Sequence, residues 1–352
     1  MAVIKQHHIC KICYLTVSVL HTPALLAWAD RLDALGQQRQ PFFFLIDFEG
    51  RYPLVYRPEE WRRAGLRFCF PGQRDPRRRP TTGGKVGLHA HPISAQTYRR
   101  AFDVVQAGLR RGDSFLTNLT FATPVTLHGT LAEVYRQSAA KYRVYLPGRF
   151  SCFSPETFVT ITATGYLETR PMKGTAADTP EARAALLGNA KEVAEHATIV
   201  DLLRNDLSQV ARGVRVTDYR YVQAIERQRG GLLQTSSAIG GQLPNDWRSS
   251  IGKLLVRLLP AGSVSGAPKL ATLGIIRRAE LGPRGYYCGV AGYFDGSTLD
   301  TCVLIRFLEQ GEGGVVFRSG GGITARSDWQ EEYAELNAKI RIPLYLGPRP
   351  KS

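Results

Sequence analysis

The 352-residue sequence is short of acidic side chains, of lysine and of long apolar runs. It contains 30 Asp and Glu against 46 Lys and Arg, which gives a formal net charge of +16. Of the basic residues only 10 are Lys and 36 are Arg, a skew that genomic nucleotide bias alone can produce on a solvated surface. No stretch is long and apolar enough to predict a membrane span. The 43% of apolar residues excludes a disordered chain and predicts a sizeable buried core.

The excess of positive charge predicts an anionic partner, which could be nucleic acid, a membrane surface or an acidic small molecule. The densest basic segment is Arg74–Arg79, which is flanked by Pro and Gly and is typical of a solvated surface loop. No aromatic side chains interleave its arginines, as a surface that stacks nucleic-acid bases requires. We therefore expect neither a nucleic-acid nor a membrane partner.

The six cysteines are sparse and scattered, which suits a reducing cytosol. Cys10 and Cys13 form a CxxC pair, but no second pair follows at zinc-site spacing. This pair alone does not predict a metal site.

The segment Ile12–Ala29 lacks charged residues and resembles a signal peptide with a small-residue cleavage site. However, an apolar stripe at helical spacing runs across the supposed cleavage point, and Pro23 stands where a helix would begin. The residues of this stripe are Leu25, Trp28, Leu32 and Leu35. We therefore predict a strand over Ile12–Leu20, a helix over Pro23–Leu35 and a cytoplasmic protein.

The rest of the chain predicts strands in runs and helices in blocks, which is typical of an α+β fold. We divide it into a short N-terminal portion, residues 1–85, that packs on the core, and a catalytic domain, residues 86–352. Further strands are predicted at 41–47, 114–121, 142–147, 156–163, 165–171, 286–294, 299–308 and 314–319. Amphipathic helices are predicted over 98–110, 179–204 and 328–340, the last beginning with a capping box at Ser327–Gln330.

Two of these helices each carry a pair of glutamates three residues apart, and such residues share one helix face. The pairs are Glu192 with Glu195, and Glu332 with Glu335. Convergent carboxylates of this kind suit Mg²⁺, which prefers oxygen ligands. The alternative is that each pair is simply solvated, with Glu335 bridging to Lys339 four residues on.

Two glycine-rich turns and one arginine complete the candidate site. The turn Pro260–Lys269 presents hydroxyl groups, among them that of Ser263. The turn Ser319–Ile323 can bring main-chain N–H groups close to a carboxylate, because glycine has no Cβ. Arg306 follows a predicted strand and could form a bidentate carboxylate clamp.

Taken in order over residues 92–345, these motifs resemble the chorismate-utilising enzymes, a family that includes anthranilate synthase component I, aminodeoxychorismate synthase component I and isochorismate and salicylate synthases. The resemblance implies the chorismate-binding fold of anthranilate synthase component I, with two large facing β-sheets and helices outside. The motifs are Gly112-Asp113, Ser154-Pro155-Glu156, Arg170–Thr175, Glu195-His196, Asp201–Leu207, Pro260–Lys269, Gly289–Tyr293, Arg306, Gly320–Gly322 and Glu332–Lys339.

Lys173 is the residue that discriminates among these enzymes. In anthranilate synthases the corresponding motif looks like Pro-Ile-Ala-Gly-Thr, whereas aminodeoxychorismate synthases have Lys at the third position, as here. The resemblance implies that Lys173 attacks C2 of chorismate as the 4-hydroxyl leaves, and that ammonia then attacks C4 and expels the lysine. The expected activity is aminodeoxychorismate synthase component I, a chorismate aminotransferase of 4-aminobenzoate and folate synthesis, and the alternative is anthranilate synthase component I.

The resemblance also implies roles for the other motif residues. Glu195 and Glu335 would bind Mg²⁺ directly, with Glu192 and Glu332 in support, and Glu156 would be the general acid. The substrate-binding set would comprise Thr175, Ser263, Tyr293, Arg306, Gly321, Gly322 and Lys339.

Two positions depart from the family pattern. Leu116 stands where the family commonly has Gln or Lys, and because Leu cannot activate water this argues against isochorismate or salicylate chemistry. Leu233 stands where the family often has His or Gln.

The implied partners are chorismate and a separate glutamine amidotransferase subunit that supplies ammonia, since no Cys here lies in a matching nucleophile motif. The short N-terminal portion does not by itself predict a tryptophan pocket. The hypothesis from another class is a nucleic-acid-binding protein that has lost catalysis, which the intact glutamate pairs oppose.

Overall fold

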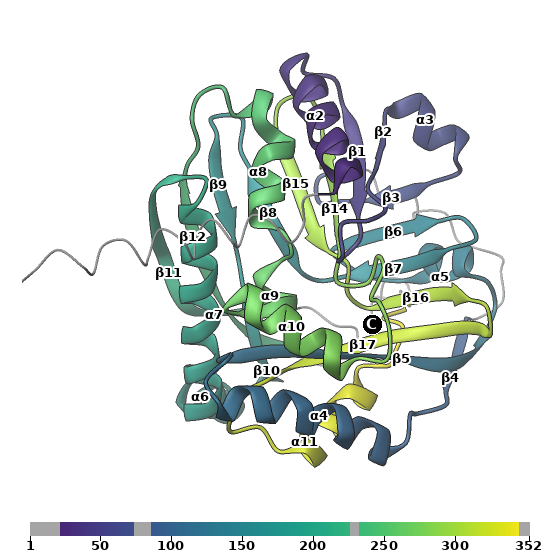
Figure 1. Cartoon of the computed structure of the whole chain (residues 1–352), viewed down its shortest axis with the longest axis vertical. Coiled ribbons are helices and arrows are strands. Elements are labelled where there is room, and N and C mark those ends of the chain that lie inside the picture. Colours follow the sequence, from purple (N-terminus) through teal and green to yellow (C-terminus); the bar gives the residue numbers. More distant parts are fainter. Residues whose placement is uncertain (1–21, 74–85, 226–231, 345–352) are drawn as a thin grey trace, which may run out of the picture.

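The computed structural model describes residues 22–73, 86–225 and 232–344 (Figure 1). The predicted strand Ile12–Leu20, the Cys10–Cys13 pair and the basic segment Arg74–Arg79 therefore lie outside the described residues. No helix in the described part of the chain is both long and apolar enough to cross a membrane.

Two large antiparallel sheets with helices on their outer sides form the fold, which confirms the predicted α+β architecture (Figure 1). The first sheet runs in the order β10 (Met172–Ala177), β12 (Leu232–Gln242), β9 (Tyr166–Thr169), β8 (Thr157–Ile161), β15 (Leu299–Val303), β14 (Val290–Phe294), β1 (Phe42–Ile46) and β2 (Leu54–Tyr56), and β11 (Arg212–Ile225) also pairs with β12. The second runs β13 (Gly266–Ala267), β5 (Leu116–His128), β17 (Gly314–Ile323), β16 (Phe307–Gly311), β7 (Phe150–Ser154), β6 (Tyr142–Leu146) and β3 (Arg67–Cys69), and β4 (Gly87–Ala90) pairs with β5.

The helices cover the sheets from outside. Figure 1 shows α4 and α11 along the second sheet, and α6 and α7 beside β11 and β12. The longer helices are α2 (Pro23–Gln37), α4 (Ala95–Arg110), α6 (Pro180–Gly188), α7 (Ala190–Ser208), α8 (Ile251–Leu258), α10 (Lys269–Ala279) and α11 (Trp329–Ala338). Shorter helical segments are α3 (Pro58–Arg63), α5 (Leu131–Gln137), α9 (Gly262–Ser265) and a 3₁₀ turn over Trp247–Ser250.

Helix α2 forms as predicted. The Thr22 hydroxyl accepts a hydrogen bond from the main-chain N–H of Leu25, and Pro23 occupies the first turn, where its missing N–H has no partner to lose. The apolar stripe of this helix is buried, and α2 packs against α8. The segment is therefore a structural helix in this fold.

The N-terminal residues contribute to both sheets. β1 lies between β14 and β2, and all five of its residues are buried. β3 pairs with β6 in the second sheet. Residues 22–73 are thus hydrogen-bonded into the same sheets as the rest of the chain.

Three predicted elements differ from those observed. The strand predicted at 299–308 is two strands, β15 and β16, in different sheets, because Arg306 adopts a positive φ of 56° and turns the chain. The helix predicted at 179–204 is two helices, α6 and α7, because the backbone of Asn189 is extended. In α11 the N-cap is Asp328, whose carboxylate accepts from the N–H groups of Gln330 and Glu331, so a capping box at Ser327 is wrong.

Candidate active site

A cavity of about 510 Å³ lies where the two sheets meet α7 and α11. The first sheet supplies Lys173, the second supplies Gly320–Gly322, and the helices supply Glu192, Glu195, Glu332 and Glu335. The predicted residues that line it are Glu156, Lys173, Glu192, Glu195, Ser263, Arg306, Gly321, Gly322, Glu332, Glu335 and Lys339. The fold therefore brings together side chains that are up to 183 residues apart in the sequence, between Glu156 and Lys339.

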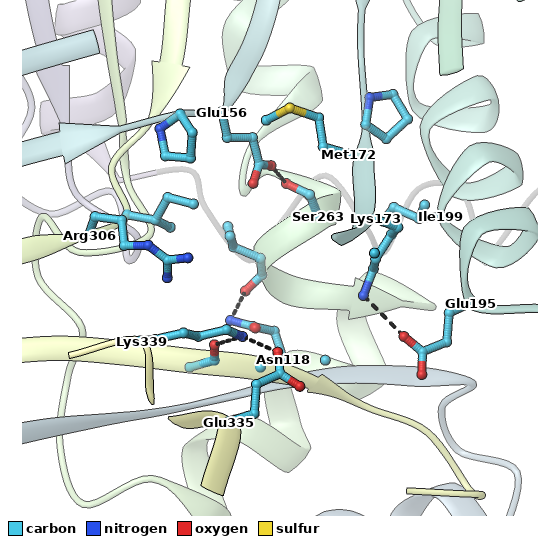
Figure 2. Close-up of a pocket in the computed structure, with 18 of the residues that line it drawn as sticks. Asn118, Glu156, Met172, Lys173, Glu195, Ile199, Ser263, Arg306, Glu335 and Lys339 are labelled. Atoms are coloured by element: carbon cyan, nitrogen blue, oxygen red, sulfur yellow. Dashed lines mark hydrogen bonds and ion pairs between the residues drawn. The ribbon is translucent and has the colours of Figure 1, made fainter. Parts of the chain in front are cut away.

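The amine of Lys173 lies 3.3 Å from a carboxylate oxygen of Glu195, and both side chains are largely buried (Figure 2). Lys173 extends from β10, and Glu195 extends from α7. The same helix places Glu192 and Ile199 against the cavity. Glu192, Glu195 and Ile199 are spaced i, i+3 and i+7, so they share one helix face. The amine of Lys173, a potential nucleophile, therefore lies beside a helix face that carries two carboxylates.

Glu156 lies on another wall and accepts a short hydrogen bond from the hydroxyl of Ser263 (Figure 2). Burial raises the pKa of Glu156, and the Ser263 hydrogen bond and the nearby charges of Lys173 and Arg306 oppose that rise. A carboxyl group with a raised pKa stays protonated closer to neutral pH, as a general acid requires. The geometry of Glu156 therefore suits proton donation into the cavity.

The opposite end of the cavity is cationic. Arg306 stands at the crossover between β15 and β16, and burial lowers its pKa. Lys339, at the end of α11, donates to the main-chain carbonyl of Gly320 at 2.8 Å and pairs with Glu335 at 2.7 Å. A Cβ on Gly320 would lie 2.7 Å from the carbonyl oxygen of Leu119, so this close approach of β17 to β5 requires glycine.

The four glutamates predicted to hold Mg²⁺ all line the cavity. They provide only oxygen donors, which is the ligand chemistry that Mg²⁺ prefers. Among the described residues no three His, Cys, Asp or Glu side chains converge into a metal-holding group. Two lysine ammonium groups instead pair with Glu195 and Glu335. The donor set thus fits Mg²⁺ in its chemistry, and the Mg²⁺ site remains a prediction.

One predicted substrate-binding residue, Tyr293, is not among the described residues that line the cavity. Tyr293 packs in an aromatic cluster, 6.2 Å from Trp61 and 5.5 Å from Phe68 between ring centroids. Tyr287, which precedes the motif Gly289–Tyr293, lines the cavity. Thr175 lies on β10 opposite Gln234 in β12, and its side chain lies outside what the structure describes.

Sequence reasoning missed several cavity-lining side chains. Asn118 follows Leu116 by two residues on β5 and lies opposite Gly322, so the period of the strand could have revealed it. Gln234 lines the cavity directly after the buried Leu233, so a polar group is present one residue beyond the expected position. Arg341 adds a further guanidinium, and no motif in the sequence marks this residue.

The chain belongs to the family of chorismate-binding enzymes. The family model described as chorismate binding enzyme matches residues 37–345, which is most of the sequence. The lysine, the carboxylates and the cationic end of the cavity thus belong to a chorismate-utilising fold.

Among proteins of known sequence, the chain is 47% identical to an uncharacterised PabA-like protein of Pasteurella multocida, over 91% of this chain and 99% of that protein. It is 32% identical to aminodeoxychorismate synthase component 1 of Salmonella typhimurium, over 70% of this chain and 57% of that protein. The chain thus matches little more than half the length of the second relative. The crystal structure of anthranilate synthase component I from Streptococcus pneumoniae is similar, with 28% identity, a TM-score of 0.61 and coverage of 75% of this chain and 62% of that chain.

Proposed function

We propose that this protein is component I of an aminodeoxychorismate synthase, which converts chorismate and ammonia into 4-amino-4-deoxychorismate for 4-aminobenzoate and folate synthesis. The observation that carries the proposal is the placement of Lys173. Its amine lines the cavity 3.3 Å from Glu195, and Glu156 lines the same cavity. The similarity to aminodeoxychorismate synthase component 1 supports the same reaction.

The proposed reaction has two displacements. The neutral amine of Lys173 forms a bond to C2 of chorismate, both ring double bonds shift (C1=C2 to C1=C6 and C5=C6 to C4=C5), and the C4–O bond breaks. Glu156 protonates the departing oxygen, which leaves as water, and recovers a proton from the lysine nitrogen. Ammonia then bonds to C4, both double bonds shift back, and the C2–N bond breaks. The proton that ammonia loses goes to the departing nitrogen of Lys173, so the enzyme returns to its starting state.

The remaining side chains bind and orient the substrate in this proposal. Arg306 and the N–H groups of Gly321 and Gly322 bind the enolpyruvyl carboxylate, with Lys339 beside them, because paired donors and fixed positive charge recognise carboxylates. Bound Mg²⁺ would neutralise the ring carboxylate of chorismate and hold it in place. The residues that would hold Mg²⁺ are Glu195 and Glu335, supported by Glu192 and Glu332.

Ammonia comes from a separate glutamine amidotransferase subunit in this proposal. The relatives named component 1 support such a division between components. We further propose a cytoplasmic location, which the free and buried thiols of Cys69, Cys152, Cys288 and Cys302 support, because free cysteines suit a reducing compartment.

The test is product identification after incubation with chorismate, Mg²⁺ and ammonium, by mass spectrometry and by the fluorescence of anthranilate. We expect 4-amino-4-deoxychorismate from the unchanged protein. Anthranilate as the main product would instead establish anthranilate synthase activity. Lys173→Ala should abolish amination, because the bond to C2 cannot form without this amine and Lys339, which also lines the cavity, pairs with Glu335. Unchanged turnover would remove Lys173 from the mechanism.

A further inference from the structure

Three consecutive hydroxyl side chains of β12 lie behind the cavity and contact the elements that carry Lys173 and Glu195. They belong to Thr235, Ser236 and Ser237, which are 1%, 1% and 0% exposed. None of the three is among the described residues that line the cavity. Their hydroxyl groups therefore act on protein groups and not on the substrate.

The first contacts fix β10. The hydroxyl of Thr235 donates a short hydrogen bond to the main-chain carbonyl of Lys173, and that of Ser236 donates to the carbonyl of Pro171 at 3.1 Å. The backbone pairing of β10 with β12 is irregular here, with a register shift between Lys173 and Thr175. The hydroxyl groups thus hold the strand where the regular ladder is interrupted.

The next hydroxyl contacts α7. Ser237 Oγ lies 2.6 Å from Nε2 of His196, which is fully buried beside Glu195. The same oxygen accepts the main-chain N–H of Arg220 at 2.9 Å, so this hydroxyl connects the imidazole of α7 to the backbone of β11. The guanidinium of Arg220 in turn donates to the carbonyls of Leu186 and Leu187 at the end of α6. Ser237 therefore joins β12 to β11 and α7, and through Arg220 to α6.

We propose that Thr235 and Ser237 are positioning residues for the amination reaction. The two residues are two apart on one strand, so their side chains share a face. Through the carbonyl of Lys173 and the imidazole of His196 they set the separation between the lysine amine and Glu195, which is 3.3 Å. A mutation away from the reacting atoms that displaces a catalytic group by about 1 Å lowers the reaction rate by about 100-fold. The hydroxyl groups that hold the elements of Lys173 and Glu195 therefore contribute to the turnover rate.

The reaction measured in this test is the amination given as the proposed function, so the proposal rests on that function. The test uses the full chain. The variants are Thr235→Val and Ser237→Ala, and the matched control is Thr169→Val. Thr169 is 3% exposed and donates to the carbonyl of Phe158 at 2.7 Å in the same sheet, so it loses an equivalent buried hydrogen bond without contact to β10 or α7. Unfolding midpoints in urea, kcat and the KM for chorismate are measured for all three.

We expect Thr235→Val and Ser237→Ala to lower kcat by about 10- to 100-fold with KM changed by less than about 2-fold, and Thr169→Val to retain kcat. Thr235→Ser, which keeps the hydroxyl, should restore kcat. Ser237→Cys keeps the shape but donates weakly, and it serves where the alanine variant does not fold. Loss of kcat in Thr169→Val equal to that in the two variants, or unchanged kcat in both variants, overturns the proposal.

A second readout needs no turnover. The rate at which an amine-directed acylating reagent modifies Lys173 is followed by peptide mass spectrometry, and we expect it to rise several-fold in Thr235→Val and Ser237→Ala as the amine leaves Glu195. Equal rates in the variants and the control refute the positioning role. Absence of 4-amino-4-deoxychorismate from the unchanged protein refutes the proposed function instead, and the modification rates still decide the role of the two hydroxyl groups.

Discussion

Replacing Lys269 by methionine removes the cation that neutralises the buried carboxylate of Asp206 in the native fold. Lys269 Nζ lies 2.8 Å from a carboxylate oxygen of Asp206 and donates to the main-chain carbonyl of Leu258 at 2.8 Å. The side chains are 10% and 5% exposed. This ion pair joins the end of α7 to the base of the turn that presents Ser263, so Lys269→Met leaves the carboxylate of Asp206 buried without its cation.

Removing one partner of a buried ion pair lowers the free energy of unfolding by about 3–5 kcal/mol, because the remaining charge stays desolvated. The pH dependence has a definite sign. Burial raises the pKa of Asp206 and the charge of Lys269 opposes that rise, so the variant has a higher folded-state pKa still. A carboxyl with a raised folded-state pKa stabilises the fold below its unfolded pKa of about 3.9 and loses that stabilisation as the pH rises through the folded value.

The assay is urea unfolding of the unchanged protein and of Lys269→Met across the pH range in which both remain folded. The deficit of the variant should grow as the pH rises from the folded-state pKa of Asp206 in the unchanged protein to the higher value in the variant, by about 1.4 kcal/mol for each unit by which the substitution raises that pKa. A deficit that is the same at both ends of this range would refute the reasoning. Arg204→Met is the control, because the side chains of Arg204 and Asp201 are 53% and 72% exposed in their pair, and this variant should lose less than about 1 kcal/mol.

Three further predictions concern the chemistry of the cavity. Glu156→Gln should lower kcat by about 100- to 10,000-fold in single-turnover assays, because it removes the proton donor, and a loss smaller than 10-fold would exclude Glu156 as the general acid. Ser263→Ala removes a hydrogen bond that lowers the pKa of Glu156, so the pH at which kcat declines on the alkaline side should move upward, and a downward shift would contradict this assignment. Glu335→Gln should weaken Mg²⁺ binding measured by calorimetry on the purified protein, whereas Glu331→Gln, on the same helix, should not, and equal affinities for the two variants would remove Glu335 from the metal-holding set.

The sequence predicted the cavity better than it predicted the elements around it. Lys173, the glutamate pairs and Arg306 were identified because each lies in a short motif that neighbouring residues in the sequence define. The helix predicted over 179–204 fared worse, since it is two helices, α6 and α7. In α7 the imidazole of His196 is fully buried, and its Nε2 bonds to Ser237, 41 residues away, a contact that helical periodicity does not report.

The same limit explains the error in the strand predicted at 299–308. No pattern within these residues indicates that the chain changes sheets, because the turn depends on a non-glycine residue, Arg306, held at positive φ by its surroundings. The position of Tyr287 at the cavity, and of Tyr293 against Phe68, likewise follows from packing. Such outcomes depend on contacts between distant segments, which local periodicity does not report.

The interior position of β1 gives the molecule a further property. Because Phe42–Ile46 lie between β14 and β2 with every residue buried, deleting the first 73 residues would strip β1 and the edge strand β2 from the first sheet and leave the edge of β14 open. β15, which adjoins β14, leads directly to Arg306. The N-terminal portion and the catalytic cavity should therefore open together in hydrogen exchange, as one cooperative folding unit, and a fragment beginning at residue 86 should not form a competent enzyme.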